Sequence, residues 1–226
     1  MIKNIIFDLD GTLVDSIPDI NASVNKTLEY IKFPSLDIEY TKKYVGNGAK
    51  LLINRVLNHF SDKYDKKYLE SIEAETYSFY MDYYSKHCTD NTKLYDNVLE
   101  TLQRFYQLNI NMFIISNKPN EITITTTKKL NIYNYFKAVI GDGVYPYRKP
   151  DINIWYNLKK DYNLIEEESL MVGDGIPDYE FAKNAKIKAL IALYGITDKQ
   201  TLLNLKNDYY INNFKEAEDF VLSINK

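Results

Sequence analysis

The chain has 226 residues, with 31 acidic and 28 basic side chains, a formal net charge of −3 and a pI near 5.5. This length suits one large domain or a domain with an insertion, and the charge balance without a long basic run argues against nucleic acid as the main partner. The single cysteine excludes an internal disulfide, and no apolar segment approaches the roughly 18 residues that span a bilayer. The start of the chain lacks a signal-peptide pattern, so we expect a cytoplasmic protein that does not bind membranes.

Six short apolar runs alternate along most of the chain with segments of helical periodicity. Val98, Leu102 and Phe105 illustrate the helical spacing. This order predicts right-handed βαβ crossovers, and therefore an α/β fold with a Rossmann-like parallel sheet, helices on both faces and ligands at the carboxyl ends of the strands. The six runs are residues 2–7, 110–115, 138–140, 170–172, 189–193 and 209–211.

Residues 15–90 interrupt this alternation, because their apolar positions follow helical spacing throughout. Ser16 and Asp19 are expected to cap the first inserted helix, and Gly46-Asn47-Gly48 forms a break before a later one. The pattern predicts an inserted α-helical domain of residues 15–90. The α/β core domain then comprises residues 1–14 and 91–226.

Two carboxylates follow the first apolar run, in the sequence Asp-Leu-Asp-Gly-Thr of residues 8–12. Asp8 and Asp10 point to the same side of an extended strand, and their repulsion requires a cation or a proton. Gly11 allows a sharp turn, and Thr12 offers a hydroxyl and a backbone N–H where an anion would lie. The motif predicts a metal-dependent nucleophile, and the alternative is an ordinary Asp/Gly turn after a core strand.

Polar residues also follow the later apolar runs. Ser116 and Asn117 precede a helix expected to begin near Pro119, and this arrangement suits either anion binding or a simple turn with a helix cap. Lys149 stands before Pro150, where we expect a helix to begin. Its ammonium group could keep a nucleophile ionised and neutralise a phosphate, although a solvated surface position is the alternative.

The fourth run is followed by Asp174 and, at a helix start, by Asp178. Together with Asp8 and Asp10 they form an oxygen-rich site that suits Mg²⁺ rather than zinc or copper. The chain has only two histidines, neither near another obvious ligand or nucleophile, so imidazole zinc sites and Ser/His triads are poorly supported.

These four motifs, in this order on an alternating α/β chain, resemble those of the haloacid dehalogenase-like hydrolase superfamily. The helical insertion after the first motif is similar to the cap of its helical-cap subclass. Within the superfamily, residues 45–52 resemble a cap segment of the phosphoglycolate phosphatases. One departure is Asp96-Asn97, which stands where those proteins commonly have Pro-Gly.

The resemblance implies a role for each motif. Asp8 would attack phosphorus to give an aspartyl-phosphate, and Asp10 would protonate the leaving group and later activate water. Mg²⁺ would be held by Asp8, the backbone carbonyl of Asp10, and Asp174. Thr12, the last residue of the first motif, is expected to bind phosphate.

The remaining motifs would complete the site. Ser116, Asn117 and Lys149 would surround the transferring phosphoryl oxygens. Asp178 would support the metal or Lys149 indirectly. In the cap, Gly46, Asn47 and Gly48 would close over the substrate.

We therefore expect a Mg²⁺-dependent phosphatase, most similar to phosphoglycolate phosphatases, that acts on a small phosphorylated metabolite as a monomer or homodimer. A pyrophosphatase or a sugar phosphomutase of the same superfamily is the alternative, since the core motifs also suit phosphoryl transfer to a second hydroxyl. A non-catalytic binding protein on this fold would be expected to lack at least one of Asp8, Asp10, Lys149 or Asp174. All four are present.

Overall fold

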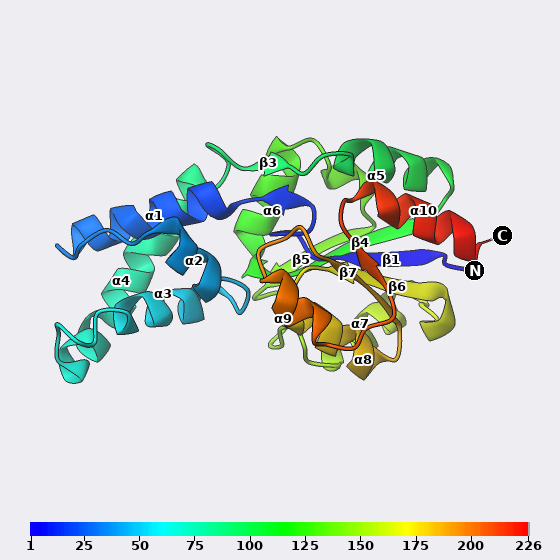
Figure 1. Ribbon diagram of the computed structural model, residues 1–226. Helices are drawn as coiled ribbons and strands as arrows, with labels where there is room; N and C mark the ends of the chain where they lie inside the picture. The colour runs from blue at the N-terminus through cyan, green and yellow to red at the C-terminus, as the bar shows by residue number, and fades with distance from the viewer. Residues whose placement is uncertain (226) are drawn as a thin grey trace.

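The computed structural model describes residues 1–225 and has a six-stranded sheet at its centre. The strand order is β5-β4-β1-β6-β7-β8, and every neighbouring pair is parallel (Figure 1). All six apolar runs form strands, which confirms the expected α/β fold with a parallel sheet. The strands are β1 (Asn4–Phe7), β4 (Asn111–Pro119), β5 (Ala138–Asp142), β6 (Ser169–Gly173), β7 (Lys188–Ala192) and β8 (Tyr210–Ile211).

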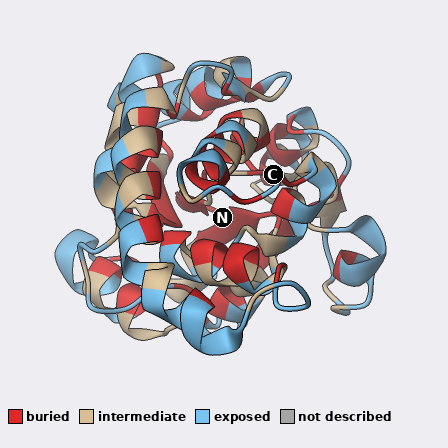
Figure 2. Ribbon diagram, turned by 90° about the vertical axis from the view of Figure 1, so that its left-hand side faces the viewer, coloured by how far each residue is buried: buried red, intermediate tan, exposed pale blue. Residues whose placement is uncertain are grey.

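Helices cover both faces of the sheet, because side chains on each buried strand alternate between the two faces. Ile5 and Phe7 of β1 belong to a cluster with α5 (Val98–Gln107) and α10 (Lys215–Ile224). Ile6 points to the other face and belongs to a second cluster that includes Trp155, Phe181 and Leu202. Figure 2 shows the buried ribbon at the centre and the exposed ribbon mainly on outer helix surfaces and loops. The other core helices are α6 (Asn120–Lys129), α7 (Asn153–Tyr162), α8 (Ile176–Ala185) and α9 (Lys199–Leu203), with 3-10 turns η1 (Tyr133–Tyr135) and η2 (Glu166–Glu168).

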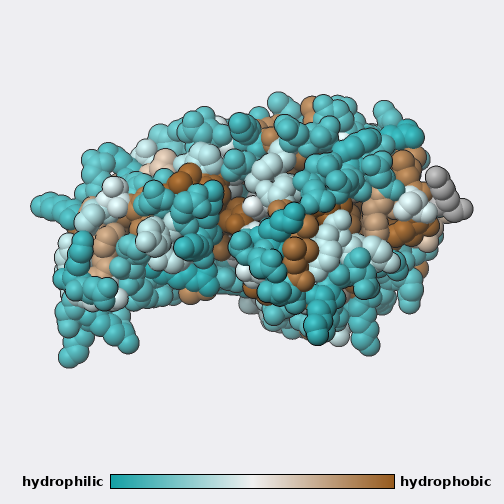
Figure 3. All heavy atoms as spheres, viewed as in Figure 1, coloured by the Kyte–Doolittle hydropathy of each residue, from teal (hydrophilic) through white to brown (hydrophobic). Residues whose placement is uncertain are grey.

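Four helices form a separate unit beyond the carboxyl ends of the strands (Figure 1). We call them the helical unit: α1 (Ile17–Tyr30), α2 (Ile38–Tyr44), α3 (Ala49–Asn58) and α4 (Lys66–His87). They share a hydrophobic cluster that includes Val24, Leu28 and Ile53. In Figure 3 the molecule has two lobes with largely hydrophilic surfaces. The division into domains at residues 14 and 90 stays a prediction.

A short antiparallel ribbon joins the two ends of the helical unit. It pairs β2 (Val14–Asp15) with β3 (Lys93–Leu94). The sequence does not predict this ribbon, because a two-residue strand is too short to show a period of two.

The expected cap of α1 by Ser16 and Asp19 is wrong. Ser16 precedes the helix, but its side chain caps no backbone N–H. The Asp19 carboxylate turns instead toward the segment that returns to the sheet, where it accepts hydrogen bonds from the backbone N–H groups of Asn91 and Thr92 and from both of their side chains. Asp19 is 1% exposed, so these donors replace the water that the buried carboxylate loses.

The helix expected at Pro150 begins three residues later, at Asn153. A turn precedes it, in which the Asp151 N–H donates to the Arg148 carbonyl at 2.9 Å. The Asp151 carboxylate then accepts from the Asn153 N–H at 2.8 Å, which stabilises the first turn of α7.

No helix in residues 1–225 combines the length and the hydropathy that a membrane-spanning segment needs.

Candidate active site

A cavity of about 810 Å³ lies where the strand ends of the core meet the helical unit. Asp8 follows β1, Ser116 lies in β4 and Asp174 follows β6, so three neighbouring parallel strands bring these residues to one edge of the sheet. Residues 46–48 line the cavity from the other side. All the predicted site residues except Thr12 and Lys149 thus line one cavity.

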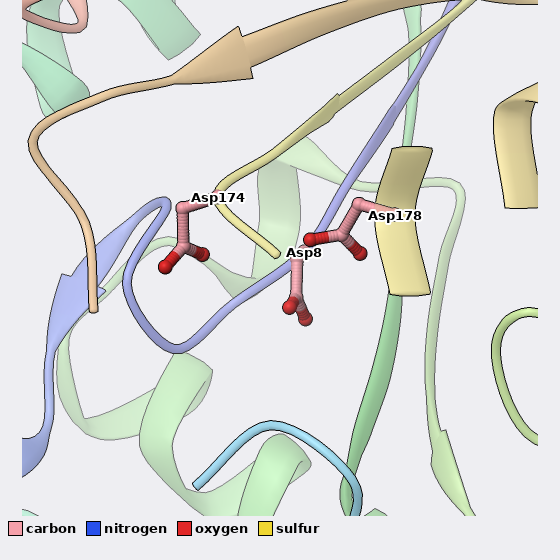
Figure 4. A group of neighbouring side chains, drawn as sticks. All are labelled: Asp8, Asp174 and Asp178. Atoms are coloured by element: carbon pink, nitrogen blue, oxygen red, sulfur yellow. The ribbon is translucent and has the colours of Figure 1, made fainter. Parts of the chain in front are cut away.

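Three carboxylates form the acidic centre of this cavity. One oxygen each of Asp8, Asp174 and Asp178 lies within 4.8 Å of the others. Figure 4 shows the side chains extending from three different segments of the chain around one space. Burial raises the pKa of Asp174 to about 8, with further increases from the charges of Asp178 and Asp8. A cation in this space would offset both effects.

Asp174 is held by hydrogen bonds to both of its oxygens. The Thr12 hydroxyl donates to one at 2.9 Å, and the Ile196 N–H donates to the other at 2.7 Å. We expected Thr12 to bind phosphate, but its fully buried hydroxyl is turned toward Asp174 and Thr12 does not line the cavity. The Thr12 side chain therefore orients a candidate metal ligand, and phosphate binding by Thr12 stays a prediction.

Two glycines make room for the Asp174 carboxylate. A Cβ atom on Gly11 would lie 2.1 Å from Asp174 Oδ2, and one on Gly195 would lie 2.3 Å from Asp174 Cβ. Gly11 also has a φ of +84°, a conformation that glycine adopts at no steric cost. The loops at these strand ends can therefore approach Asp174 only because both residues lack a side chain.

Lys149 joins two of the carboxylates. Its Nζ lies 2.6 Å from Asp178 Oδ1 and 3.0 Å from Asp8 Oδ1, and its side chain is 1% exposed. Burial alone would lower the pKa of Lys149, but the charges of Asp178 and Asp8 outweigh it and raise the pKa. The side chain therefore stays an ammonium group beside Asp8. Asp178 also accepts from the Gly175 N–H at 2.9 Å, so both of its oxygens have protein partners.

Asn117 connects the core to the helical unit, because its side-chain amide binds backbone groups of both. Its Nδ2 donates to the carbonyls of Lys149 and Gly46, and its Oδ1 accepts from the Lys149 N–H at 2.9 Å. These contacts occupy the Asn117 side chain, and the expected binding of phosphate by Asn117 stays a prediction. Ser116, by contrast, lines the cavity, and its hydroxyl donates to no protein group in residues 1–225.

Lys118 is the main residue that the sequence analysis missed. Its Nζ lies 2.9 Å from Asp10 Oδ1 and 3.0 Å from Oδ2, and it also contacts the hydroxyl of Tyr84 on α4. Each aspartate of the first motif thus has its own lysine, with Asp8 beside Lys149 and Asp10 beside Lys118. The run Ser-Asn-Lys-Pro of residues 116–119 could have indicated this contact. A lysine at the end of a strand beside two aspartates is expected to pair with one of them.

The loop of residues 46–48 is held by two arginines. Arg55 donates to the Asn47 side chain and to the Tyr44 carbonyl, both at 2.9 Å. Arg148 of the core donates to the Asn47 carbonyl at 3.2 Å. The loop expected to close over a substrate is therefore fixed from both sides of the cavity.

The donor set fits a hard divalent cation such as Mg²⁺. The ligands offered are carboxylate oxygens, which hard divalent cations prefer. When all four carboxylates of the site are ionised, the two ammonium groups leave two negative charges for a divalent cation to neutralise. Asp174 forms no ion pair within residues 1–225, and Asp8 Oδ2 accepts no hydrogen bond there. Asp178 is instead paired with Lys149, so Asp8 and Asp174 are the better candidate metal ligands.

Mg²⁺ affinity is expected to depend steeply on pH. With a pKa of about 8, Asp174 is protonated below that pH and must release its proton to bind metal. We expect the Mg²⁺ dissociation constant to rise by roughly tenfold for each pH unit below about 7. In metal-free protein the raised pKa means that protonated Asp174 adds to the free energy of unfolding. This contribution is complete below the ordinary pKa of 3.8 and is lost as the pH rises through about 8. Mg²⁺ should therefore stabilise the fold most at high pH.

Calorimetric titration with Mg²⁺ at pH 6, 7 and 8, with thermal unfolding in parallel, measures both effects. Asp174→Asn should remove the pH dependence, and Asp161→Asn, an exposed site on α7, should keep it. A dissociation constant that stays the same from pH 6 to pH 8 in the unsubstituted protein would contradict the prediction.

The family profile described as haloacid dehalogenase-like hydrolase matches residues 5–192. The chain belongs to this family, as its motifs indicated. It is 30% identical to a phosphoglycolate phosphatase of Vibrio parahaemolyticus over 97% of this chain and 96% of that protein, and 32% identical to one of Photobacterium profundum over the same shares. A predicted phosphoglycolate phosphatase from Haemophilus somnus has a similar structure, with a TM-score of 0.89 and 25% identity over 100% of this chain and 98% of the other.

Proposed function

We propose that the protein is a Mg²⁺-dependent phosphatase that hydrolyses small phosphomonoesters through an aspartyl-phosphate, with 2-phosphoglycolate as its substrate. The observation that carries the proposal is the pairing of Asp8 with Lys149 and of Asp10 with Lys118 at the edge of one cavity. The full-length similarity to phosphoglycolate phosphatases supports the choice of substrate.

Asp8 is the nucleophile in this mechanism. Its Oδ1 accepts from the Leu9 N–H at 2.7 Å and lies beside Lys149, whereas Oδ2 has no protein partner in residues 1–225. Oδ2 therefore attacks phosphorus while the bond from phosphorus to the leaving oxygen breaks. The Lys149 ammonium keeps Asp8 ionised and faces the negative charge of the phosphoryl group.

Asp10 moves the protons. In the first step it gives a proton to the leaving oxygen, and in the second it takes one from the water that attacks the aspartyl-phosphate. This second attack releases inorganic phosphate and restores Asp8. Asp8, Asp174 and the Asp10 carbonyl would hold Mg²⁺, whose positive charge would offset the negative charge of the phosphate oxygens. Ser116 offers its hydroxyl to one of them.

Replacing Asp10 by Asn is expected to slow alkyl phosphates more than aryl phosphates. An alkoxide needs a proton to leave, whereas a phenoxide leaves with less help, so the loss should be roughly 10²- to 10³-fold or more for 2-phosphoglycolate and smaller for 4-nitrophenyl phosphate. Initial rates of phosphate release with both substrates measure the difference. The comparison requires that hydrolysis of the phosphoenzyme does not limit the rate, and a single-turnover experiment checks this condition. Equal losses for the first step would argue against Asp10 as the acid.

The cavity wall on the helical unit suits a second anionic group on the substrate. Lys43 and Arg55 line it and form no ion pair among the described residues. Lys42 is paired with Glu39 at 2.7 Å, so this pair adds no net charge. A substrate with a phosphate at Asp8 and a carboxylate at this wall would meet positive charge at both ends. 2-Phosphoglycolate has both of these groups. Gly46, Asn47 and Gly48 would then close the cavity over it.

A substrate panel tests the proposed function. Phosphate release with Mg²⁺ from 2-phosphoglycolate, hexose phosphates, nucleotides and pyrophosphate should give the highest kcat/KM for 2-phosphoglycolate. Highest activity with pyrophosphate would favour a pyrophosphatase, and conversion between two sugar phosphates without phosphate release would identify a mutase. Arg55→Met should lower kcat/KM more for 2-phosphoglycolate than for 4-nitrophenyl phosphate, which has no carboxylate.

A further inference from the structure

We propose that Lys118 and Tyr84 form a positioning pair that fixes the Asp10 carboxylate and makes its placement depend on the seating of α4 against the core. This inference rests on the proposed function, in which Asp10 transfers protons. Asp10 is the residue that acts on the reacting atoms, and Lys118 and Tyr84 act through it.

Lys118 contacts both oxygens of Asp10. The two distances, 2.9 and 3.0 Å, are nearly equal, so the ammonium group lies between the oxygens and fixes the rotation of the carboxylate. The Lys118 side chain is 2% exposed, and the hydrogen bond from its own backbone N–H to Ser116 Oγ at 3.3 Å helps to set the strand end that carries it. A buried ammonium with this geometry leaves the carboxylate little freedom.

Tyr84 brings the helical unit into this contact. It lies on α4, is 2% exposed and receives the third contact of Lys118 Nζ through its hydroxyl. Nζ also lies 4.7 Å from the centre of the Tyr84 ring, which suits a cation–π interaction. Tyr80, one turn earlier, stacks on Tyr84 with 5.4 Å between ring centres and prevents the ring from turning aside.

The three donors of the Lys118 ammonium are thus divided between two carboxylate oxygens of the core and one hydroxyl of the helical unit. If α4 moves away, Lys118 loses Tyr84 and is free to leave Asp10. Proton transfer by Asp10 is then efficient only while the helical unit is seated as in this structure. Lys149 has no such contact, since its ion-pair partners, Asp8 and Asp178, both lie in the core.

The test uses Lys118→Met and Tyr84→Phe. We expect Lys118→Met to lower kcat for 2-phosphoglycolate by roughly 30- to 100-fold with KM changed less than about threefold, because proton transfer is impaired and substrate contacts are kept. Tyr84→Phe should lower kcat by about tenfold, since it removes one hydrogen bond to a charged group. 4-Nitrophenyl phosphate needs little acid catalysis in the first step, so in both variants the impaired second step should become limiting. A larger fraction of each variant than of the unsubstituted protein should then carry phosphate during turnover, measured as hydroxylamine-sensitive phosphate.

A double-mutant cycle separates positioning from a general structural effect. In an Asp10→Asn background, Lys118→Met should cause little further loss, because its action passes through the missing carboxylate. Matched controls are Lys129→Met on α6 and Tyr68→Phe on α4, two exposed positions that should keep full activity. The urea midpoints of all variants show which of them remain folded.

The inference is overturned if folded Tyr84→Phe and Lys118→Met retain the kcat of the unsubstituted protein, or if Lys118→Met costs as much in the Asp10→Asn background as alone. Failure of the proposed function has a different signature. In that case the unsubstituted protein would release no phosphate from any substrate of the panel, or Asp8→Asn would keep full activity.

Discussion

Replacing Asp8 by Asn is expected to lower Mg²⁺-dependent phosphate release by roughly 10⁴-fold. Asparagine keeps the shape of the side chain and can still accept the hydrogen bond from the Leu9 N–H. Its amide nitrogen, however, is a far weaker nucleophile than a carboxylate oxygen, so no phosphoenzyme should form. Lys149 keeps Asp178 as a partner at 2.6 Å, and the fold should therefore remain intact.

Two measurements distinguish this loss from a loss of structure. The variant should still bind 2-phosphoglycolate in calorimetry with Mg²⁺, and it should show no hydroxylamine-sensitive phosphate after mixing with substrate. Asp161→Asn, at an exposed position, serves as the matched control and should retain full activity. Retained activity in Asp8→Asn would overturn the assignment of the nucleophile.

Replacing Lys149 by Met is expected to reduce both activity and stability. Activity should fall by roughly 10²- to 10³-fold, because the ammonium group faces the charge that develops on the phosphoryl group. The free energy of unfolding should fall by about 3–5 kcal/mol at pH 8 without metal, because Asp8 and Asp178 lose the charge that compensates them.

The stability loss in Lys149→Met should shrink as the pH falls. Burial raises the pKa of Asp178 well above its ordinary value even with Lys149 present, and removal of the lysine raises it further. Below that pKa the carboxyl group is neutral and needs no compensating charge. Urea unfolding at pH 5, 6.5 and 8 measures the trend, with Lys183→Met on α8, at an exposed position, as the control. A loss that is equal at all three pH values would contradict the prediction.

The sheet and the metal-ligand candidates could be predicted from the sequence because local patterns determine them. Each strand is a short apolar run, and a residue that follows such a run in a parallel sheet must lie at the ligand-binding edge. This placed Asp8, Ser116 and Asp174 at one cavity although 166 positions separate the first from the last. The departure at Asp96-Asn97 has a similar local explanation, because Asn97 adopts the left-handed φ of +66° that a glycine would otherwise take.

The contacts that the sequence did not predict depend on the distance between side chains in the folded chain. Asp19 was expected to cap its own helix, but tertiary folding brings residues 91 and 92 to it, and their donors compete successfully. The contact between Lys118 and Tyr84 joins residues 34 positions apart on two different units. The amide of Asn117 could have faced a phosphate as well as a backbone, and only the folded loops decide between them.

The hydrogen bonds of Asp19 have a mechanical consequence. Both chain segments that connect the helical unit to the sheet pass this one buried carboxylate, the first as the start of α1 and the second at Asn91 and Thr92. The β2–β3 ribbon ties the same two segments together directly beside it. We therefore expect the two connections to move together, so that a rotation of the four helices over the cavity would have its hinge near Asp19.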